Sequence, residues 1–309
     1  MNKYALTVEN LTKIYSDSKN KKENKALNNL NFQVKQGEIF GLLGPNGAGK
    51  TTFLSILAGT VSKTNGSINV WGFDIDKNPR QVKASIGIVP QEVNLDAFFS
   101  PKKLLELQAG LYGVTKKDRI TDLILKMVSL ENKANAYSRS LSGGMKRRLL
   151  IAKAMVHQPP ILILDEPTAG VDVELRKNLW NNVKELNKEG VTIILTTHYL
   201  FEAQEMCDRI AIIDKGTLVA LDTTQKLLDR IQTKKIIFTV KDVDINKSLL
   251  IKGIKLKIIS KNLISATYEK GSLDFREIIN YLNQNEIKIE DISTEEGDLE
   301  DVFVQLTKH

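Results

Sequence analysis

The 309-residue chain has few cysteines and no long apolar run, the features that mark disulfide-rich and membrane-spanning proteins. Its single cysteine, Cys207, excludes an internal disulfide and suits a reducing compartment. We expect it to be a small buried apolar side chain in a helical segment after His198. No apolar run approaches the roughly 18–20 residues that a membrane-spanning helix needs. The residues from Met1 on lead directly into an expected strand, so we expect no export signal.

The net charge is also modest, and the basic residues are scattered along the chain. The 44 basic and 37 acidic residues give a formal net charge of +7. The densest basic run, residues 19–25, contains asparagine and glutamate and is interpreted as a solvated loop between strands. Because the basic residues are scattered, we expect no nucleic-acid partner. A net positive charge of this size would suit an anionic membrane surface equally well.

One glycine-rich stretch stands out. Residues 44–51 read G-P-N-G-A-G-K-T, after an expected buried strand over 38–43 and before an expected helix over 51–57. Glycine permits backbone conformations in which consecutive N–H groups surround phosphate oxygens, and the helix adds the positive end of its dipole. Lys50 is then placed for the β- and γ-phosphates, and the Thr51 hydroxyl for Mg²⁺. A glycine-rich turn with an incidental lysine is the alternative. The expected nucleotide contacts are Gly44, Pro45, Asn46, Gly47, Ala48, Gly49, Lys50, Thr51 and Thr52.

An acidic pair follows a second apolar run. Residues 161–164 are all isoleucine or leucine and follow two prolines, a pattern typical of a strand buried on both faces. Asp165, at its carboxyl end, can hold Mg²⁺ directly or through water. Glu166 should point elsewhere because side chains alternate along a strand, and it is our candidate general base. The alternative is an ordinary charged strand end before Pro167.

A second glycine-bearing turn reads L-S-G-G-M over residues 141–145 and precedes an expected helix over 146–157. Its N–H groups and the helix dipole could also face an anion. Standing alone, the turn would be a plain capped helix start.

These motifs, in this order, make residues 6–223 resemble the ATP-binding subunit of ATP-binding-cassette (ABC) transporters. The resemblance implies ATP and Mg²⁺ as cofactors and an α/β P-loop NTPase fold. It implies a cassette over 1–230, with a mixed β core, a RecA-like α/β sheet and a helical subdomain at about 92–140. The sequence predicts short strands with one helix up to about residue 90, and helices over 101–111 and 117–130. It also predicts parallel strands over 161–164, 191–197 and 210–214, followed by an antiparallel strand over 217–221. Residues 236–309 would form a small α+β appendage.

The family further implies a nucleotide site that two chains share. Ser142, Gly143 and Gly144 would contact the γ-phosphate held by the opposite subunit, so that two copies, expected to be identical, pair head to tail across a two-fold axis. Asp172 matches the loop that communicates across this dimer. Tyr15 matches the aromatic that stacks on adenine, although one aromatic near a strand is usually part of a core.

Two more positions acquire roles from the resemblance. Gln91, after an expected strand, matches the glutamine that approaches the metal and the attacking water, so the implied metal ligands are Thr51, Gln91 and Asp165. His198 matches the switch histidine at the γ-phosphate and joins Glu166 as a catalytic residue. The other histidines, His157 and His309, fit no such position.

The chain departs from the commonest family pattern at two positions. Met145 stands where many members have glutamine, and Ala169 where serine is frequent. Neither change removes a charged residue of the expected site, so we expect hydrolysis to survive.

The C-terminal 236–309 segment has no concentration of catalytic residue types. Its expected strands are 236–240, 263–268 and 287–292, and its expected helices are 275–283 and 299–306. The Leu299–Phe303 pattern and residues 196–200 resemble bacterial drug- and polysaccharide-export-like ATPases that work with a separate six-helix permease.

The resemblance thus implies a peripheral protein at the cytoplasmic face of the inner (plasma) membrane. Phe98 and Phe99, in the helical subdomain, could form an exposed docking patch for the permease or belong to the subdomain core. A soluble ABC ATPase acting on nucleic acid or ribosomes is the alternative function, but such proteins usually carry two cassettes or a coiled-coil insertion. A regulatory module that binds ATP without hydrolysing it is disfavoured by Glu166 and His198.

Overall fold

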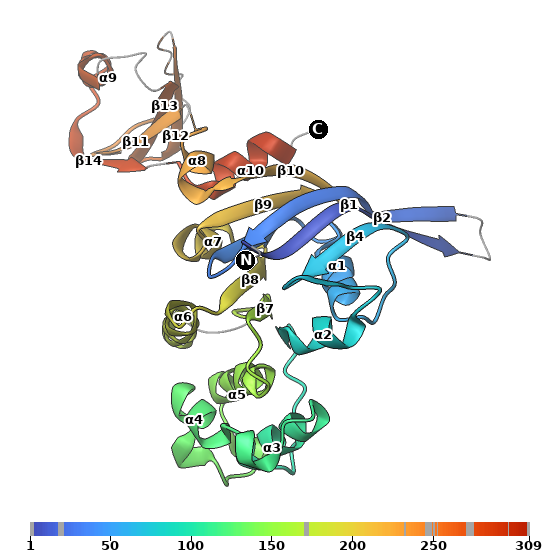
Figure 1. Ribbon diagram of the computed structural model, residues 1–309. Helices are drawn as coiled ribbons and strands as arrows, with labels where there is room; N and C mark the ends of the chain where they lie inside the picture. Colours follow the sequence, from blue (N-terminus) through green and yellow to red (C-terminus); the bar gives the residue numbers. More distant parts are fainter. Residues whose placement is uncertain are drawn as a thin grey trace. The chain divides into compact units, whose positions relative to one another are not determined.

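The computed structural model divides the chain into two compact units, 1–223 and 224–309 (Figure 1). It describes residues 3–17, 22–169, 173–231, 233–244, 249, 251, 253–269, 275–295 and 297–307. Asp172, expected to communicate across a dimer, lies outside the described residues.

The first unit begins with an antiparallel sheet of order β2-β1-β4-β5. Its strands are β1 (Tyr4–Asp17), β2 (Lys22–Lys35), β4 (Asn65–Val70) and β5 (Phe73–Asp74). The expectation of short strands here is wrong, because β1 and β2 have 14 residues each. The expected loop over 19–25 is wrong from Lys22 on, since these polar residues pair with β1, for example Asn24 with Tyr15.

A six-stranded sheet of order β10-β9-β3-β8-β7-β6 forms the centre of the unit. Its strands are β3 (Ile39–Leu43), β6 (Ile86–Val89), β7 (Ile161–Asp165), β8 (Thr192–Thr197), β9 (Arg209–Asp214) and β10 (Thr217–Thr223). β6, β7, β8, β3 and β9 run parallel, and β10 is antiparallel to β9, as the sequence predicts. The parallel strands therefore end at a common edge, where ligands of such sheets bind.

Aromatic side chains join the two sheets and helix α1 (Lys50–Leu57) in one core. Phe32 stacks on Phe40 with ring centroids 5.7 Å apart and meets Phe53 of α1 at 5.4 Å. This packing fixes the start of α1 beside the carboxyl edge of the parallel sheet.

The helical part of the unit contains α3 (Pro101–Leu111), α4 (Thr121–Met127) and α5 (Gly143–Met155), which lie together away from β1, β2 and β4 (Figure 1). The helix expected over 117–130 is shorter, because Arg119 is extended and Ser129 has a left-handed φ of 53°. The remaining helices of this unit are α2 (Pro79–Ala84), α6 (Val173–Lys188) and α7 (Leu200–Met206). None of the helices that the structure describes is long and apolar enough to traverse a bilayer.

Cys207 is buried, as the sequence predicts, but it is the extended residue that ends α7 and does not lie within the helix. Burial raises the pKa of its thiol, so the side chain behaves as an apolar group.

The second unit is a four-stranded antiparallel sheet of order β12-β13-β11-β14 with helices. Its elements are α8 (Thr224–Leu228), β11 (Thr233–Val240), β12 (Ile254–Ser260), β13 (Leu263–Glu269), α9 (Phe275–Gln284), β14 (Ile289–Glu295) and α10 (Leu299–Thr307). The sequence did not predict β12, in which lysines alternate with apolar residues at the sheet edge. The core includes Phe238, Ile264, Ile278 and Leu282, all fully buried.

Candidate active site

A pocket of about 740 Å³ lies at the carboxyl edge of the parallel sheet. Most of the site residues predicted within one chain line it, from β1, the loop before α1, and the segments after β6, β7 and β8. The predicted lining residues are Tyr15, Pro45, Asn46, Gly47, Ala48, Gly49, Lys50, Thr51, Thr52, Gln91, Asp165, Glu166 and His198. Asn24, Lys25, Ala26 and Lys215 complete the lining and were not predicted.

Glycine is required in the loop before α1. Gly47 and Gly49 have left-handed φ values of 82° and 107°. A Cβ atom on Gly49 would come within 2.7 Å of the Ala26 carbonyl oxygen, and one on Gly44 within 2.3 Å of the Ile213 carbonyl oxygen. The loop therefore keeps a fixed shape, in which the Ala48 N–H donates to the Pro45 carbonyl oxygen at 3.1 Å and the other N–H groups can face phosphate oxygens.

Lys50 provides the positive charge of this loop. Its Nζ donates to the carbonyl oxygens of Gly44 at 2.6 Å and Pro45 at 3.2 Å. Burial lowers the pKa of Lys50, and the neighbouring Glu166 and Asp165 carboxylates oppose that shift. A buried ammonium group facing two carboxylates is suited to an anionic ligand with a divalent cation.

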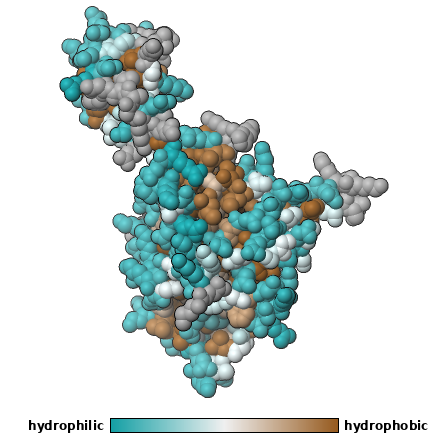
Figure 2. All heavy atoms as spheres, turned by 45° about the horizontal axis from the view of Figure 1, so that its top comes forward, coloured by the Kyte–Doolittle hydropathy of each residue, from teal (hydrophilic) through white to brown (hydrophobic). Residues whose placement is uncertain are grey.

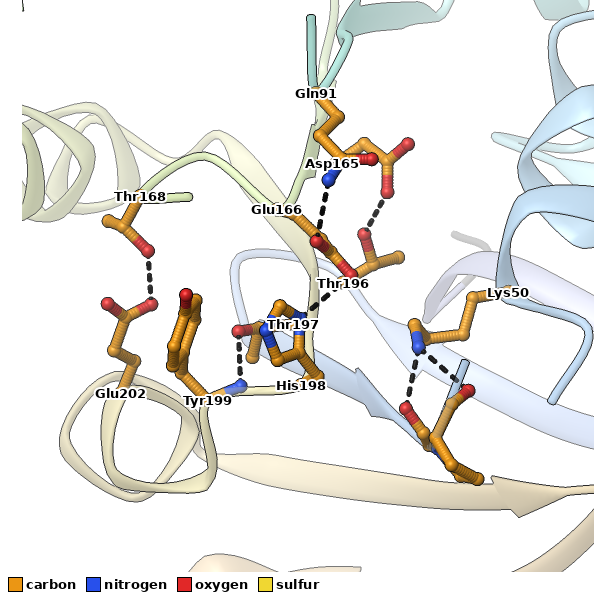
Figure 3. Close-up of polar contacts among 12 residues, drawn as sticks. Lys50, Gln91, Asp165, Glu166, Thr168, Thr196, Thr197, His198, Tyr199 and Glu202 are labelled. Carbon is orange, nitrogen blue, oxygen red and sulfur yellow. Dashed lines mark hydrogen bonds and ion pairs between the residues drawn. The ribbon is translucent and has the colours of Figure 1, made fainter. Parts of the chain in front are cut away.

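Asp165 ends β7 and is fixed by β8. The Thr196 hydroxyl donates to Asp165 Oδ1 at 2.5 Å (Figure 3). Burial raises the pKa of Asp165, while the Thr196 hydrogen bond and the Lys50 charge lower it. Thr196 thus orients the carboxylate that could hold a metal ion, and the sequence did not single it out for this contact.

Glu166 lies at the centre of the polar contacts in Figure 3. Gln91 Nε2 donates to Glu166 Oε2 at 2.9 Å, and His198 Nδ1 lies 3.0 Å from Glu166 Oε1. The Glu166 side chain is only 10% exposed. Three residues that are far apart in the sequence therefore meet around one carboxylate.

The reason given by the sequence for the direction of Glu166 is wrong. β7 ends at Asp165, and Glu166 has a left-handed φ of 43°. Its N–H donates to the Thr196 carbonyl oxygen at 2.9 Å. A turn, rather than strand alternation, directs the side chain toward His198.

Arg147 fixes the segment that carries Gln91. From α5 its guanidinium donates to the carbonyl oxygens of Pro90 at 3.0 Å and Gln91 at 2.7 Å. Arg147 is 4% exposed, and burial lowers its pKa. The sequence alone does not indicate this role of Arg147, although Arg147 lies on the helix that the glycine turn at 142–144 begins.

Tyr15 belongs to the pocket wall and not to the apolar core. Its side chain is 40% exposed, and Lys13 Nζ lies 4.8 Å from the ring centroid. One face of an aromatic ring is thus available near the phosphate loop for a flat ligand group.

The glycine turn at residues 142–144 begins α5, earlier than the sequence predicted. Ser142 is the N-cap and accepts a hydrogen bond from the Met145 N–H at 3.3 Å. Ser142 and Gly143 are exposed, and a Cβ atom on Gly143 would meet nothing within 4 Å. Gly144 is buried, and no residue of this turn is among the described lining of the nucleotide pocket.

The donor groups of the pocket fit a nucleotide with Mg²⁺. Thr51, Gln91 and Asp165 bring a hydroxyl, an amide and a carboxylate oxygen to one pocket, and Mg²⁺ commonly takes one or two carboxylates plus phosphates and water. Within the part of the chain that the structure describes, no three or more His, Cys, Asp or Glu side chains are grouped so that they could hold a metal ion. A Mg²⁺ ion in this pocket would therefore also need phosphate or water ligands.

Comparison with known proteins gives the family. Residues 27–169 match the family model described as ABC transporter. The linearmycin resistance ATP-binding protein LnrL of Bacillus subtilis (strain 168) is 40% identical over 229 residues, which are 73% of this chain and 71% of LnrL. The Nod factor export ATP-binding protein I of Cupriavidus pinatubonensis is 42% identical over 205 residues, which are 66% of this chain and 63% of that protein.

Solved structures agree with these relatives. One is a dimeric ATP-binding cassette in a post-hydrolysis state, bound to ADP and Pi. The match covers 71% of this chain and 98% of the cassette chain, with a TM-score of 0.62 and 27% sequence identity. The ATP-binding subunit of an ABC transporter matches 73% of this chain and 92% of its own with a TM-score of 0.64 and 27% identity. The predicted P-loop NTPase fold is thereby confirmed, and this chain belongs to the ABC transporter family as an ATP-binding subunit that hydrolyses ATP.

Proposed function

We propose that two copies of this chain close around two Mg-ATP and drive export through a separate membrane permease. The observation that carries the proposal is the Glu166 carboxylate, held by Gln91 and His198 in the pocket that also contains Lys50 and Asp165. The name of the Nod factor export protein supports the transport direction. Neither that name nor the name of LnrL favours a soluble ATPase acting on nucleic acid or ribosomes.

The pocket residues that the sequence predicts have tasks in ATP binding and hydrolysis. The loop N–H groups and Lys50 hold the β- and γ-phosphates, and Tyr15 packs on the adenine. Thr51, Gln91 and Asp165 would hold Mg²⁺, which supplies positive charge at the phosphates. Glu166 accepts the proton of the attacking water, and His198 binds the γ-phosphate.

A second copy would complete the pocket. Ser142, Gly143 and Gly144 begin α5, whose N-terminus suits an anion, and the first two of them are exposed. The dimeric relative bound to ADP and Pi supports this arrangement. We therefore propose that this turn contacts the γ-phosphate in the partner, with homodimers as the simplest assembly.

The helical part of the first unit presents an apolar surface suited to a permease. Phe98 is 72% and Leu111 is 83% exposed, so the alternative that Phe98 belongs to a core is not observed. Apolar side chains reach the surface at the lower end of Figure 2, where Figure 1 places α3 and α4. The other large exposed apolar side chains of residues 92–140 are Val93, Phe99, Leu107, Tyr112, Leu123 and Tyr137.

We propose that residues 92–140 dock on the permease at the cytoplasmic face of the inner membrane, which would make the chain a peripheral protein. The proposed domains are the cassette over 1–230 and the α+β appendage over 236–309, whereas the two compact units of the structure divide at 223/224. An apolar surface of this kind is typical of a protein interface.

The Phe98→Ser variant tests the transport proposal. With its permease in detergent or nanodiscs, the unchanged chain should hydrolyse ATP faster than it does alone. We expect Phe98→Ser to weaken permease binding by about tenfold, the effect of roughly 1.4 kcal/mol, while hydrolysis by the isolated chain stays unchanged.

Phe201→Ser is the matched control, because Phe201 is 70% exposed on α7, outside residues 92–140. Binding should be measured by co-purification and hydrolysis by phosphate release. Equal permease binding by both variants would contradict docking through this surface, and a chain that never co-purifies with a membrane protein would contradict the transport proposal.

A further inference from the structure

The backbone at Glu166 is held in an unfavourable conformation. Its φ of 43° is left-handed, a conformation that residues with a side chain rarely adopt. Pro167 follows, and a residue before proline favours an extended conformation. The Ala169 N–H donates to the Glu166 carbonyl oxygen at 3.2 Å, so residues 166–169 form a tight turn. Such a turn persists only where surrounding contacts hold it.

A buried hydrogen bond holds the far side of this turn. The Thr168 hydroxyl donates to Glu202 Oε2 at 2.6 Å, and the two residues are 1% and 3% exposed (Figure 3). Burial raises the pKa of Glu202, whereas the Thr168 hydrogen bond and the Arg176 and His198 charges lower it. Arg176 Nε lies 3.2 Å from Glu202 Oε1 and supplies the opposite charge.

Glu202 also belongs to the element that carries His198. It lies on α7, which begins at Leu200, directly after His198 and Tyr199. The rings of His198 and Tyr199 are 4.1 Å apart, and the Arg176 guanidinium lies 5.8 Å from the Tyr199 ring centroid. The Thr168–Glu202 hydrogen bond therefore joins the turn of Glu166 to the helix that follows its partner His198.

We propose that Thr168 and Glu202 are positioning residues for ATP hydrolysis. Their hydrogen bond holds the turn that carries Glu166. While the turn is held, the Glu166 carboxylate keeps its contacts with Gln91 and His198. Without the hydrogen bond, the left-handed backbone can relax and move the carboxylate away from them. The inference rests on the proposed role of Glu166 as general base.

A similar set of side chains elsewhere in the chain provides a control. Thr121 and Arg119 both bind the Glu106 carboxylate in the helical part of the first unit. None of these three residues lines the nucleotide pocket. Removing the Thr121 hydroxyl thus breaks a contact of the same chemistry at a place where no catalytic group depends on it.

The test compares Thr168→Val, Thr168→Ser and Thr121→Val in the full chain. Thr168→Val keeps the side-chain shape but removes the donor, and we expect kcat for ATP hydrolysis to fall by about 10- to 100-fold, with KM changed by less than about twofold. Thr168→Ser keeps the donor and should retain nearly the full kcat. Thr121→Val should lose stability but retain kcat.

Glu202→Ala should lower kcat as Thr168→Val does, and the double variant should be no slower than the slower single one. If Thr168→Val fails to fold, Thr168→Ala replaces it. The inference is overturned if the Thr168 variants without the hydroxyl keep the full kcat, or if Thr168→Ser loses as much as they do. Absence of hydrolysis by the unchanged chain, alone and with its permease, would instead overturn the proposed function, and the inference with it.

Discussion

Replacing Glu166 with glutamine is expected to lower steady-state ATP hydrolysis by about 100- to 10,000-fold, the range that a general base contributes. The amide has nearly the same size as the carboxylate, so the side chain can stay between Gln91 and His198. It cannot accept a proton from water at neutral pH. Phosphate release under saturating Mg-ATP measures the effect, and binding of a fluorescent ATP analogue should show an affinity close to that of the unchanged chain.

Glu185→Gln is the control for this substitution. Glu185 is an exposed carboxylate on α6, paired with Lys188 at 2.7 Å, and does not line the nucleotide pocket. Its hydrolysis rate should equal that of the unchanged chain. Sustained turnover by Glu166→Gln would remove Glu166 from the role of general base and leave the geometry around it without a catalytic purpose.

Lys50→Ala is expected to raise the Kd for ATP by about 100-fold or more. A charge-assisted hydrogen bond contributes about 1.5–3 kcal/mol, and Lys50 can form one with each of two phosphates. The pocket would also keep the Asp165 and Glu166 carboxylates without the ammonium group that now opposes their charge. Isothermal titration with Mg-ATP gives the Kd directly.

Lys63→Ala serves as the comparison, because Lys63 pairs with Asp76 at 2.7 Å and lies outside the pocket lining. It should bind ATP like the unchanged chain. Tight ATP binding by Lys50→Ala would contradict the assignment of residues 44–52 as the phosphate loop.

The sequence predicts best what depends on local pattern. At the glycine-rich loop over 44–51 and the apolar run over 161–164, a few neighbouring residues determine the local structure. The structure accordingly has β3, α1 and β7 within one residue of the expected positions. The relatives confirm the fold that these motifs imply.

The contacts that fix the site depend on residues far apart in the chain. Thr196 and Asp165 are separated by 31 positions, Thr168 and Glu202 by 34, and Arg147 and Pro90 by 57. No spacing rule indicates which hydroxyl or guanidinium will meet which carboxylate or carbonyl across such distances. The pairing of β7 with β8 brings Thr196 to Asp165, and the packing of α5 and α7 against the sheet brings the other groups together.

The left-handed backbone conformations of Glu166 and Ser129 could not be predicted from the sequence either. A glutamate before proline gives no sign of a left-handed conformation, and the sequence therefore assigned Glu166 to the end of a strand. The shortening of α4 has a similar origin, since Ser129 adopts a left-handed φ where helix periodicity alone would continue.

The mass of Glu166→Gln in solution, with and without Mg-ATP, tests the shared pocket most directly. We expect a monomer without nucleotide and a dimer with saturating Mg-ATP. Adding Gly143→Glu should prevent dimerisation, because a carboxylate on the exposed turn would repel the partner's γ-phosphate while the helix start tolerates it. A protein that stays monomeric with Mg-ATP, or whose dimer forms equally well with Gly143→Glu, would contradict a nucleotide site completed by the second copy.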